Sequence, residues 1–315
     1  MNRNEATATQ VERWATVANI VAPTTLLGAL LFYFGYVSSQ AEYAYFGLDV
    51  GTIGLSTQEY IMRSPQPLLV PLLTLPLAGA GFLLADAAVR RRIAPASIDM
   101  ADQAKAAKVF KRVSRGSTAA GLAALFAGIV LLFIYSYIRD WPFYGLVTPV
   151  ALASGAGLAA YSSHLRRTIK IAAHHTRAAD TQLSPIDRLS SLPRAATVLI
   201  YALIIASIFW ATATIAQWSG LGLAQSQAQH LDRLPSVILD TRERLYLRDP
   251  GIEETVLRAS QGQTFHYRYR HLRLLIQGHD QMFLVPDVWS ASDSTLIVPI
   301  DGSVRVQFQF QNASP

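Results

Sequence analysis

Histidine and carboxylate side chains in the C-terminal part of the chain are the first candidates for chemistry. His266, His271 and His279 lie there, together with Asp280 and Asp287. Imidazoles and carboxylates can form a metal site or an acid–base pair when the fold brings them together. Here they fall on three different predicted strands or turns, and no motif spacing joins them. The sequence alone therefore leaves both possibilities open without assigning a site.

Three further histidines, His164, His174 and His175, lie in a predicted loop between membrane spans. Adjacent residues of a helix point about 100° apart, so His174 and His175 do not form the same-face pair that metal binding uses. We expect solvated side chains at all three positions.

Other catalytic patterns are missing from the sequence. The chain has no cysteine, which excludes disulfides, thiol nucleophiles and cysteine-bound zinc or iron–sulfur clusters. Ser292, Asp293 and Ser294 lie together, but no Gly-x-Ser-x-Gly elbow surrounds them, and we interpret them as turn residues. No phosphate-binding loop or dinucleotide fingerprint occurs. The sequence predicts no catalytic, cofactor-binding or metal-ligating residue.

The composition is typical of a membrane protein. Of 315 residues, 51% are apolar and only 15% are charged, against about 25% charged in soluble chains. A membrane-spanning helix needs about 20 predominantly apolar residues. Five windows meet this length, at residues 15–37, 67–89, 118–138, 144–161 and 195–217. We interpret the first as a retained span, because a cleaved signal has an apolar region of only about 7–15 residues.

Few features inside the spans indicate a transport path. Asp86 is the one acidic residue, and it lies beside a run of arginines at the end of the second span. Pro71, Pro76 and Pro149 could break helices around a site, although neighbouring helices commonly accommodate such prolines. Small residues four apart, at positions 151, 155 and 159, favour close packing of the fourth span against another helix.

The basic residues predict the orientation of the chain in the membrane. Sixteen lysines and arginines lie in the N-terminal tail and in the loops after spans two and four, whereas the opposite side has only Arg63 and Arg139. The positive-inside rule then places the N-terminus in the cytoplasm and the C-terminus outside. Beyond residue 219 the chain is nearly neutral, so the net charge of +6 does not indicate nucleic-acid binding.

The region from residue 220 onward is predicted to be a small all-β domain, a sandwich or barrel. Apolar and polar residues alternate over about seven short segments, as in half-buried strands. Between Tyr269 and Leu272 the apolar positions change parity, which predicts a turn or bulge at Arg270–His271. The predicted segments are residues 236–239, 244–248, 265–269, 272–276, 282–285, 295–300 and 304–310.

The loop at residues 38–66 is longer than a simple connection between two spans requires. Ser56 and Glu59 have the spacing of a capping box, which predicts a short helix beginning at Thr57. Aromatic residues of this loop, such as Tyr43 and Tyr60, suit the headgroup layer. Since the loop and the β-domain share one side of the membrane in this prediction, we expect them to pack together.

Three segments resemble a group of actinobacterial multi-pass membrane proteins that carry no assigned activity. These segments are YFGLDVGTIGLSTQEYIMRS at residues 45–64, LPSVILDTRERLYLRDPGIEETVL at 234–257 and MFLVPDVWSASDSTLIVPIDGSVRVQF at 282–308. The resemblance implies the same plan of spans followed by a β-domain, and a bacterial origin. It implies no substrate, cofactor or site residue.

Taken together, the sequence predicts a bacterial inner-membrane protein with a five-helix domain at residues 1–219 and an extracytoplasmic β-domain at 220–315. We expect a non-catalytic anchor whose β-domain serves in protein interaction or sensing. Its expected partners are the lipid bilayer and an envelope protein or a second copy of the chain, without nucleic acid or cofactor. A small channel or transporter subunit is the first alternative. The second is an enzyme acting on lipid or cell-wall precursors through loop residues Glu42, Asp49, Glu59, Arg63 and Asp140.

Overall fold

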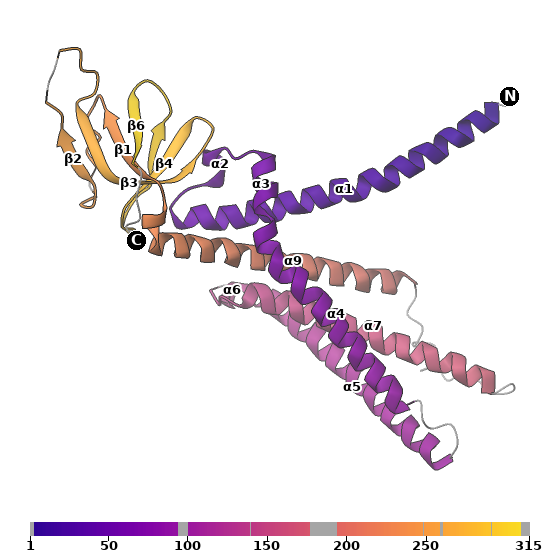
Figure 1. Ribbon diagram of the computed structural model, residues 1–315. Coiled ribbons are helices and arrows are strands. Elements are labelled where there is room, and N and C mark those ends of the chain that lie inside the picture. Colours follow the sequence, from indigo (N-terminus) through magenta and orange to yellow (C-terminus); the bar gives the residue numbers. More distant parts are fainter. Residues whose placement is uncertain are drawn as a thin grey trace. The chain divides into compact units, whose positions relative to one another are not determined.

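The structure, a computed structural model of the chain, describes residues 3–93, 100–138, 140–176, 194–247, 249–258, 261–290 and 292–309. For helix residues 3–21, 89–90, 92–93, 100–114, 163–176 and 194, it describes the backbone alone. Figure 1 gives the element labels used below. The chain forms two compact units, one of Met1–Leu69 with Ala216–Pro315 and the other of Val70–Ile215. Helix α1, the long loop and the end of α9 thus belong with the sheet, whereas the predicted boundary at residue 219 groups them with the other spans.

The helices account for most of the chain before residue 230. The long ones are α1 (Arg3–Tyr45), α4 (Pro65–Ile93), α5 (Met100–Phe133), α7 (Tyr144–Thr176) and α9 (Arg194–Gln229). The short ones are α2 (Val50–Ile53), α3 (Thr57–Arg63), α6 (Tyr135–Ile138) and the 3₁₀ helix η1 (Leu231–Arg233). Helices α4 and α7 continue through their prolines as single elements.

Four segments among the described residues are long and apolar enough to cross a membrane: Pro65–Ala88, Arg115–Phe133, Tyr144–Ser162 and Ala195–Gln229. They overlap the second to fifth predicted spans, although the third segment ends at Phe133, whereas the predicted span continues to residue 138. Large apolar side chains along α4, among them Leu72, Leu77 and Leu84, are exposed, as expected where lipid is the solvent. The chain is therefore a membrane protein. The first predicted span lies in α1, where the side chains before residue 22 are outside the described set, and it stays a prediction.

Within the unit Val70–Ile215, small residues allow α5 and α7 to pack closely. A Cβ at Gly155 would lie 2.7 Å from the backbone nitrogen of Leu125, and one at Gly121 would lie 3.1 Å from that of Ala159. The predicted packing role of the small-residue stripe is thus confirmed. Asp86 also serves packing, since the Tyr161 hydroxyl of α7 donates a hydrogen bond of 2.7 Å to its carboxylate.

The C-terminal domain contains one antiparallel sheet of six strands: β1 (Ser236–Thr241), β2 (Glu253–Val256), β3 (Tyr267–Gln277), β4 (Gln281–Pro286), β5 (Leu296–Pro299) and β6 (Val304–Gln309). Their order is β5-β4-β3-β1-β6, and β2 pairs with the first part of β3. Strands β5 and β6 do not pair with each other among the described residues, so the sheet is open and not a closed barrel.

One predicted strand, at residues 244–248, was wrong, and one strand was missed. Residues 244–247 have the alternating pattern but form no strand, and Leu245 instead donates its N–H to the Tyr269 hydroxyl at 2.8 Å. Residues 265–269 and 272–276 belong largely to one strand, β3, which a bulge interrupts. The missed strand is β2, whose sequence Glu-Glu-Thr-Val lacks the apolar alternation because three of its four side chains are exposed.

The two faces of the sheet are buried in different ways. One face has its own core, in which Val237, Leu239 and Leu284 are fully buried. On the other face, Phe283 and Val285 of β4 are fully buried against helix residues. Phe283 packs in a cluster with residues of α1, α2 and α3 and their connections, and Val285 packs with Phe46, Ala224 and Leu231. The sheet is therefore docked on the ends of α1 and α9, next to which it lies in Figure 1.

The long loop supplies much of this docking surface, as predicted. The capping box is present: the Ser56 hydroxyl accepts from Glu59 N at 3.3 Å, and the Glu59 carboxylate accepts from Ser56 N at 2.6 Å. Helix α3 begins at Thr57 as expected, and its Tyr60 is buried. Thr295 in the sheet domain donates a hydrogen bond of 2.7 Å to the carbonyl of Phe46. The expected packing of loop against β-domain is thus confirmed.

Candidate functional site

The predicted bulge at Arg270–His271 is present and divides the sheet. Leu239 of β1 pairs with Tyr269 and Val237 pairs with Leu272, so two residues of β3 lie opposite one residue of β1. Before the bulge β3 pairs with β2, and after it β3 pairs with β4. His271 therefore lies at the point along β3 where pairing with β2 ends and pairing with β4 begins.

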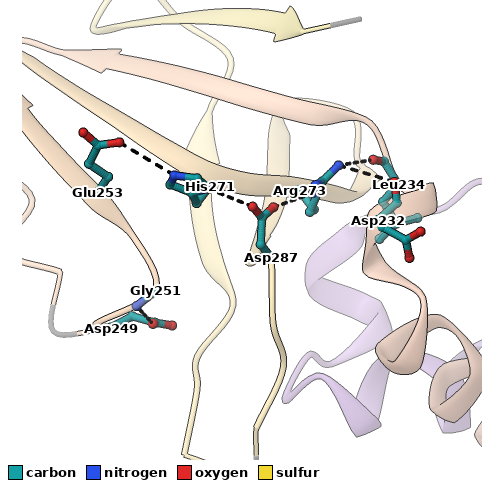
Figure 2. Close-up of polar contacts among 8 residues, drawn as sticks. All are labelled: Asp232, Leu234, Asp249, Gly251, Glu253, His271, Arg273 and Asp287. Carbon is teal, nitrogen blue, oxygen red and sulfur yellow. Dashed lines mark hydrogen bonds and ion pairs between the residues drawn. The ribbon is translucent and has the colours of Figure 1, made fainter. Parts of the chain in front are cut away.

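His271 is the centre of a row of polar contacts at this point, which Figure 2 shows. Its Nδ1 lies 2.9 Å from an Asp287 oxygen, just after β4, and its Nε2 lies 3.7 Å from a Glu253 oxygen in β2. Arg273 of β3 donates from Nε to the second oxygen of Asp287. The Arg273 guanidinium also contacts the carbonyls of Asp232 and Leu234, at 3.4 and 3.2 Å, between α9 and β1. The branch-point row, as we call these residues, joins β2 to the connection between α9 and β1.

The row can exchange protons and bind polar groups, but it has no nucleophile. The ring of His271 is half-exposed, and each of its two nitrogens lies near a carboxylate. In the described part of the chain its side chain contacts no hydroxyl that it could activate. No group of three metal-ligating side chains was found among the described residues. The row is better suited to electrostatic recognition or sensing than to hydrolysis.

The structure joins His271 and Asp287 and separates the other C-terminal candidates. His266 has a ring nitrogen 3.3 Å from the carbonyl of Arg242, and His279 is exposed beside Asp280 at 4.0 Å. Asp293 accepts from Ser290 N at 2.6 Å, which fits the predicted role in a turn. His164, His174 and His175 lie in the last part of α7, residues 163–176, whose side chains are outside the described set.

The backbone of His271 is in a costly conformation. Its φ is +62°, and that of Tyr246 is +52°, the two positive values found at non-glycine residues in the described ranges. A left-handed conformation costs an L-residue about 1–2 kcal/mol. Strained residues of this kind cluster at functional sites, where contacts with the surrounding structure hold the unfavourable backbone conformation. The strain and the polar row together make this side of the β-domain the candidate functional surface.

We expect His271→Gly to unfold less readily than His271→Ala, by about 1 kcal/mol, because only glycine adopts a positive φ without strain. Both variants lose the imidazole contacts equally, so the difference measures the backbone alone. Denaturant unfolding of the purified protein gives the comparison. At Arg270, which has no positive φ, alanine should instead be the more stable residue. The same order at both positions would contradict a strained His271.

Exposed side chains also occur on the segments that carry the branch-point row. Val256 ends β2 and is 68% exposed, and Val288 follows Asp287 and is 77% exposed. Tyr246 is also exposed, and the Arg244 guanidinium lies 5.1 Å from its ring centre while pairing with Glu254 at 2.6 Å. Tyrosine and arginine are enriched in protein interfaces, and exposed apolar side chains favour contact with a partner.

The loop residues considered for lipid chemistry have structural roles. Asp49 caps α2 by accepting from Gly51 N at 2.7 Å, and Glu59 belongs to the capping box of α3. Asp140 lies in the other compact unit. Glu42 is buried at the junction of three helices, where Arg63 of α3 and Gln227 of α9 each lie 3.3 Å from its carboxylate. These residues do not gather into one catalytic site.

We expect Glu42→Gln to leave stability at neutral pH within about 1 kcal/mol of the native value or above it. Burial raises the pKa of Glu42, and the attraction of Arg63 and the Gln227 hydrogen bond do not offset this. Ionisation of Glu42 therefore opposes folding, so the native protein should lose stability relative to the variant as pH rises above about 4.5. Unfolding midpoints between pH 4 and 8 test this, and a constant difference over that range would contradict it.

Sequence reasoning missed Arg273 and Glu253 as members of the row. Both are charged residues within strands. The pairing of β2 with β3 brings Glu253 to His271, and Arg273, in the same strand as His271, joins the row through Asp287. The one available signal was Arg273 itself, a charge inside the apolar run of residues 272–276.

Comparison with known proteins adds no relative: no family model, no curated protein and no solved structure matches the chain. The function must therefore be argued from the site itself.

Proposed function

We propose that the chain is a non-catalytic membrane anchor that holds a β-domain at the outer face of a bacterial inner membrane for interaction with another protein. In this proposal five helices cross the bilayer, α1 supplying the first crossing. The N-terminus lies in the cytoplasm and the β-domain outside, as the distribution of basic residues favours. The partner is an envelope protein or a second copy of the chain.

The docking of the sheet on the helix ends carries this proposal. Phe283 and Val285 are completely buried against elements of the long loop and α9, so the domain does not hang on a flexible linker. A domain fixed in this way presents the same surface to its surroundings at all times. The side chains it leaves exposed include His271 of the row, Thr255, which shares its face of β2 with Glu253, and Val288. The chemistry of these residues favours binding over catalysis.

Photo-cross-linking in living cells of the native host tests the proposal. A photoreactive amino acid is placed at Thr255, which shares its face of β2 with Glu253, or at Val288 in the full chain, and at Phe308 of β6 as a control. Phe308 is 59% exposed but belongs to a strand away from the row. The expected result is one protein adduct of the same mass from both test positions and its absence from the control. Adducts of equal yield at all three positions would contradict a specific surface.

Enzymatic activity is the second readout of this experiment. A purified protein with a turnover that disappears in His271→Ala, while the fold persists, would overturn the non-catalytic proposal. Mass spectrometry of the adduct separates the two expected partners, because a second copy of the chain doubles the mass.

Reporter fusions test the proposed orientation separately. We expect alkaline phosphatase fused after Asn312 to be active, because that enzyme folds only outside the cytoplasm, and the same reporter within residues 101–112 to be inactive. A cytoplasmic fluorescent reporter should give the reverse pattern. Activity at both phosphatase positions, or at neither, would contradict the odd number of spans proposed between residue 112 and residue 312.

A further inference from the structure

Two arginines of the β-domain share one buried carboxylate. Asp240 of β1 lies directly opposite Arg268 of β3 and Arg305 of β6, so the three side chains share one face of the sheet. Asp240 is fully buried, whereas the side chains of Arg268 and Arg305 are 24% and 48% exposed. Thr255 of β2 lies opposite Arg268 and is exposed on the same face. Phe308 alternates with Arg305 along β6 and lies on the other face.

Asp240 occupies only one edge of each guanidinium group. Arg268 donates to it from Nε and Nη2, at 2.8 and 3.1 Å, and Arg305 donates from the same two nitrogens. Both Nη2 atoms bind the same oxygen, Oδ2, so the two guanidinium groups lie side by side. Neither Nη1 atom donates to a residue in the described part of the chain. Because both side chains are partly exposed, an acceptor from outside the chain can reach these donors.

The guanidinium group of Arg305 is held in place although half of its side chain is exposed. Asp240 fixes one edge of the group, which also lies 5.1 Å from the centre of the Phe265 ring. A side chain that is already held loses less conformational entropy when it binds a partner. Since one arginine is enough to balance the charge of Asp240, the second positive charge is available to a ligand.

The charge of the pair favours a monoanion. Two guanidinium groups and one carboxylate leave one net positive charge, and the planar fork of arginine matches the two oxygens of a carboxylate. A lipid phosphate can carry the same charge, but the position of the pair disfavours it. β1 begins beside the end of α9, and Asp240 is the fifth of its six residues, so the pair lies toward the end of the strand away from that helix (Figure 1).

We propose that Arg268 and Arg305 bind an acidic side chain of the protein that docks on the β-domain. The free N–H groups of Arg305 donate to its carboxylate oxygens, Arg268 adds the second positive charge, and Asp240 is a positioning residue. The inference rests on the proposed function in protein interaction and adds the chemistry of the contact.

Binding of a fluorescent hexaglutamate peptide to the purified full chain tests the site, with hexaglutamine as the uncharged reference. We expect saturable binding of hexaglutamate alone, about tenfold weaker in Arg305→Gln, as for the loss of a charge-assisted hydrogen bond. Arg305→Lys keeps the charge but lacks the planar fork, so its affinity should stay well below the native value. Arg242→Gln is the matched control and should change the affinity less than about twofold, because Arg242 is exposed and donates to the carbonyl of Gly302.

Three results of the peptide experiment would overturn the inference. They are no saturable binding of hexaglutamate, equal losses in Arg305→Gln and Arg242→Gln, and native affinity in Arg305→Lys, since any positive charge would then suffice. Phosphatidylglycerol vesicles that displace the peptide from the native chain would assign the pair to the membrane instead. Unfolding midpoints accompany each affinity, and Arg305→Lys keeps a cation beside Asp240 where Arg305→Gln is less stable.

Cross-linking at Thr255 separates this inference from the proposed function. The adduct should decrease in Arg305→Gln and stay at the native level in Arg242→Gln. An undiminished adduct in Arg305→Gln would overturn this contact and leave the interaction function standing. Hexaglutamate binding without any adduct in the native chain would contradict the protein partner, and with it the inference.

Discussion

Replacing Gly220 or Gly35 by alanine should destabilise the docked unit by about 2–3 kcal/mol, as expected for overpacking that no side-chain rotation can relieve. A Cβ at Gly220 would overlap the backbone oxygen of Ser38, and one at Gly35 would overlap that of Tyr60. Either methyl group forces two helices apart, α9 from α1 or α3 from α1. The apparent melting temperature in detergent and the protease resistance of the β-domain should both fall.

Gly222 and Gly28 are the matched controls for this prediction. They lie in the same two helices, and a Cβ at either position meets no atom within 4 Å. Alanine there should leave stability unchanged or raise it by up to about 1 kcal/mol, because alanine has the higher helix propensity. Equal effects at all four glycines would contradict the close helix crossings, since propensity alone acts at every position.

Removing the carboxylate of Asp240 should have an effect of similar size, about 2–3 kcal/mol at neutral pH, because it leaves partly exposed charged donors without their acceptor. This residue of β1 is fully buried, between Arg268 of β3 and Arg305 of β6. Arg268 donates to both of its oxygens, at 2.8 and 3.1 Å, and Arg305 donates from Nε at 3.0 Å. Asp240→Ala leaves two arginines without their shared partner. Arg305→Ala should cost less, because Arg305 is half-exposed and the pair with Arg268 remains.

The pH dependence of the Asp240 variants has a definite sign. Burial alone would raise the pKa of Asp240, but the hydrogen bonds and charges of Arg268 and Arg305 outweigh it and lower the pKa below 3.8. The carboxylate therefore contributes its full stability above about pH 5 and loses it as pH falls through the lowered pKa. The difference in unfolding free energy between the native protein and Asp240→Asn should be constant from pH 5 to 8 and shrink below pH 4. A difference that grows with acidity would contradict the ion pair.

Local sequence patterns were sufficient to predict those features that depend on a few residues close together in the chain. The capping box at Ser56 and Glu59 predicted the start of α3 to the residue, because two side chains satisfy the backbone groups next to them. The parity change at Arg270–His271 predicted the bulge, because a strand cannot otherwise turn its apolar side chains to the opposite face. Apolar length alone indicated the membrane helices.

The alternation of apolar and polar residues failed to predict strands where strand formation depends on the neighbouring segments. Leu245 and Leu247 alternate like a strand, yet the backbone there is held by the Tyr269 hydroxyl and has no partner strand among the described residues. Glu253–Val256 carries no apolar pattern and is a strand nevertheless, because the free edge of β3 before the bulge accepts it. Strand formation depends on an available neighbour, which is not visible in a short window of sequence.

The amino-acid sequence by itself determined that this is a membrane protein with apolar helices followed by β-structure, since those properties depend on hydrophobic length and periodicity. Only the tertiary structure decided that His271, Asp287, Arg273 and Glu253 form one row. It also decided that Arg63 of α3 and Gln227 of α9 meet at Glu42. These residues come from separate strands and helices, and their proximity depends on strand register and helix crossing. Both are set by contacts between segments far apart in the chain, which no local pattern encodes.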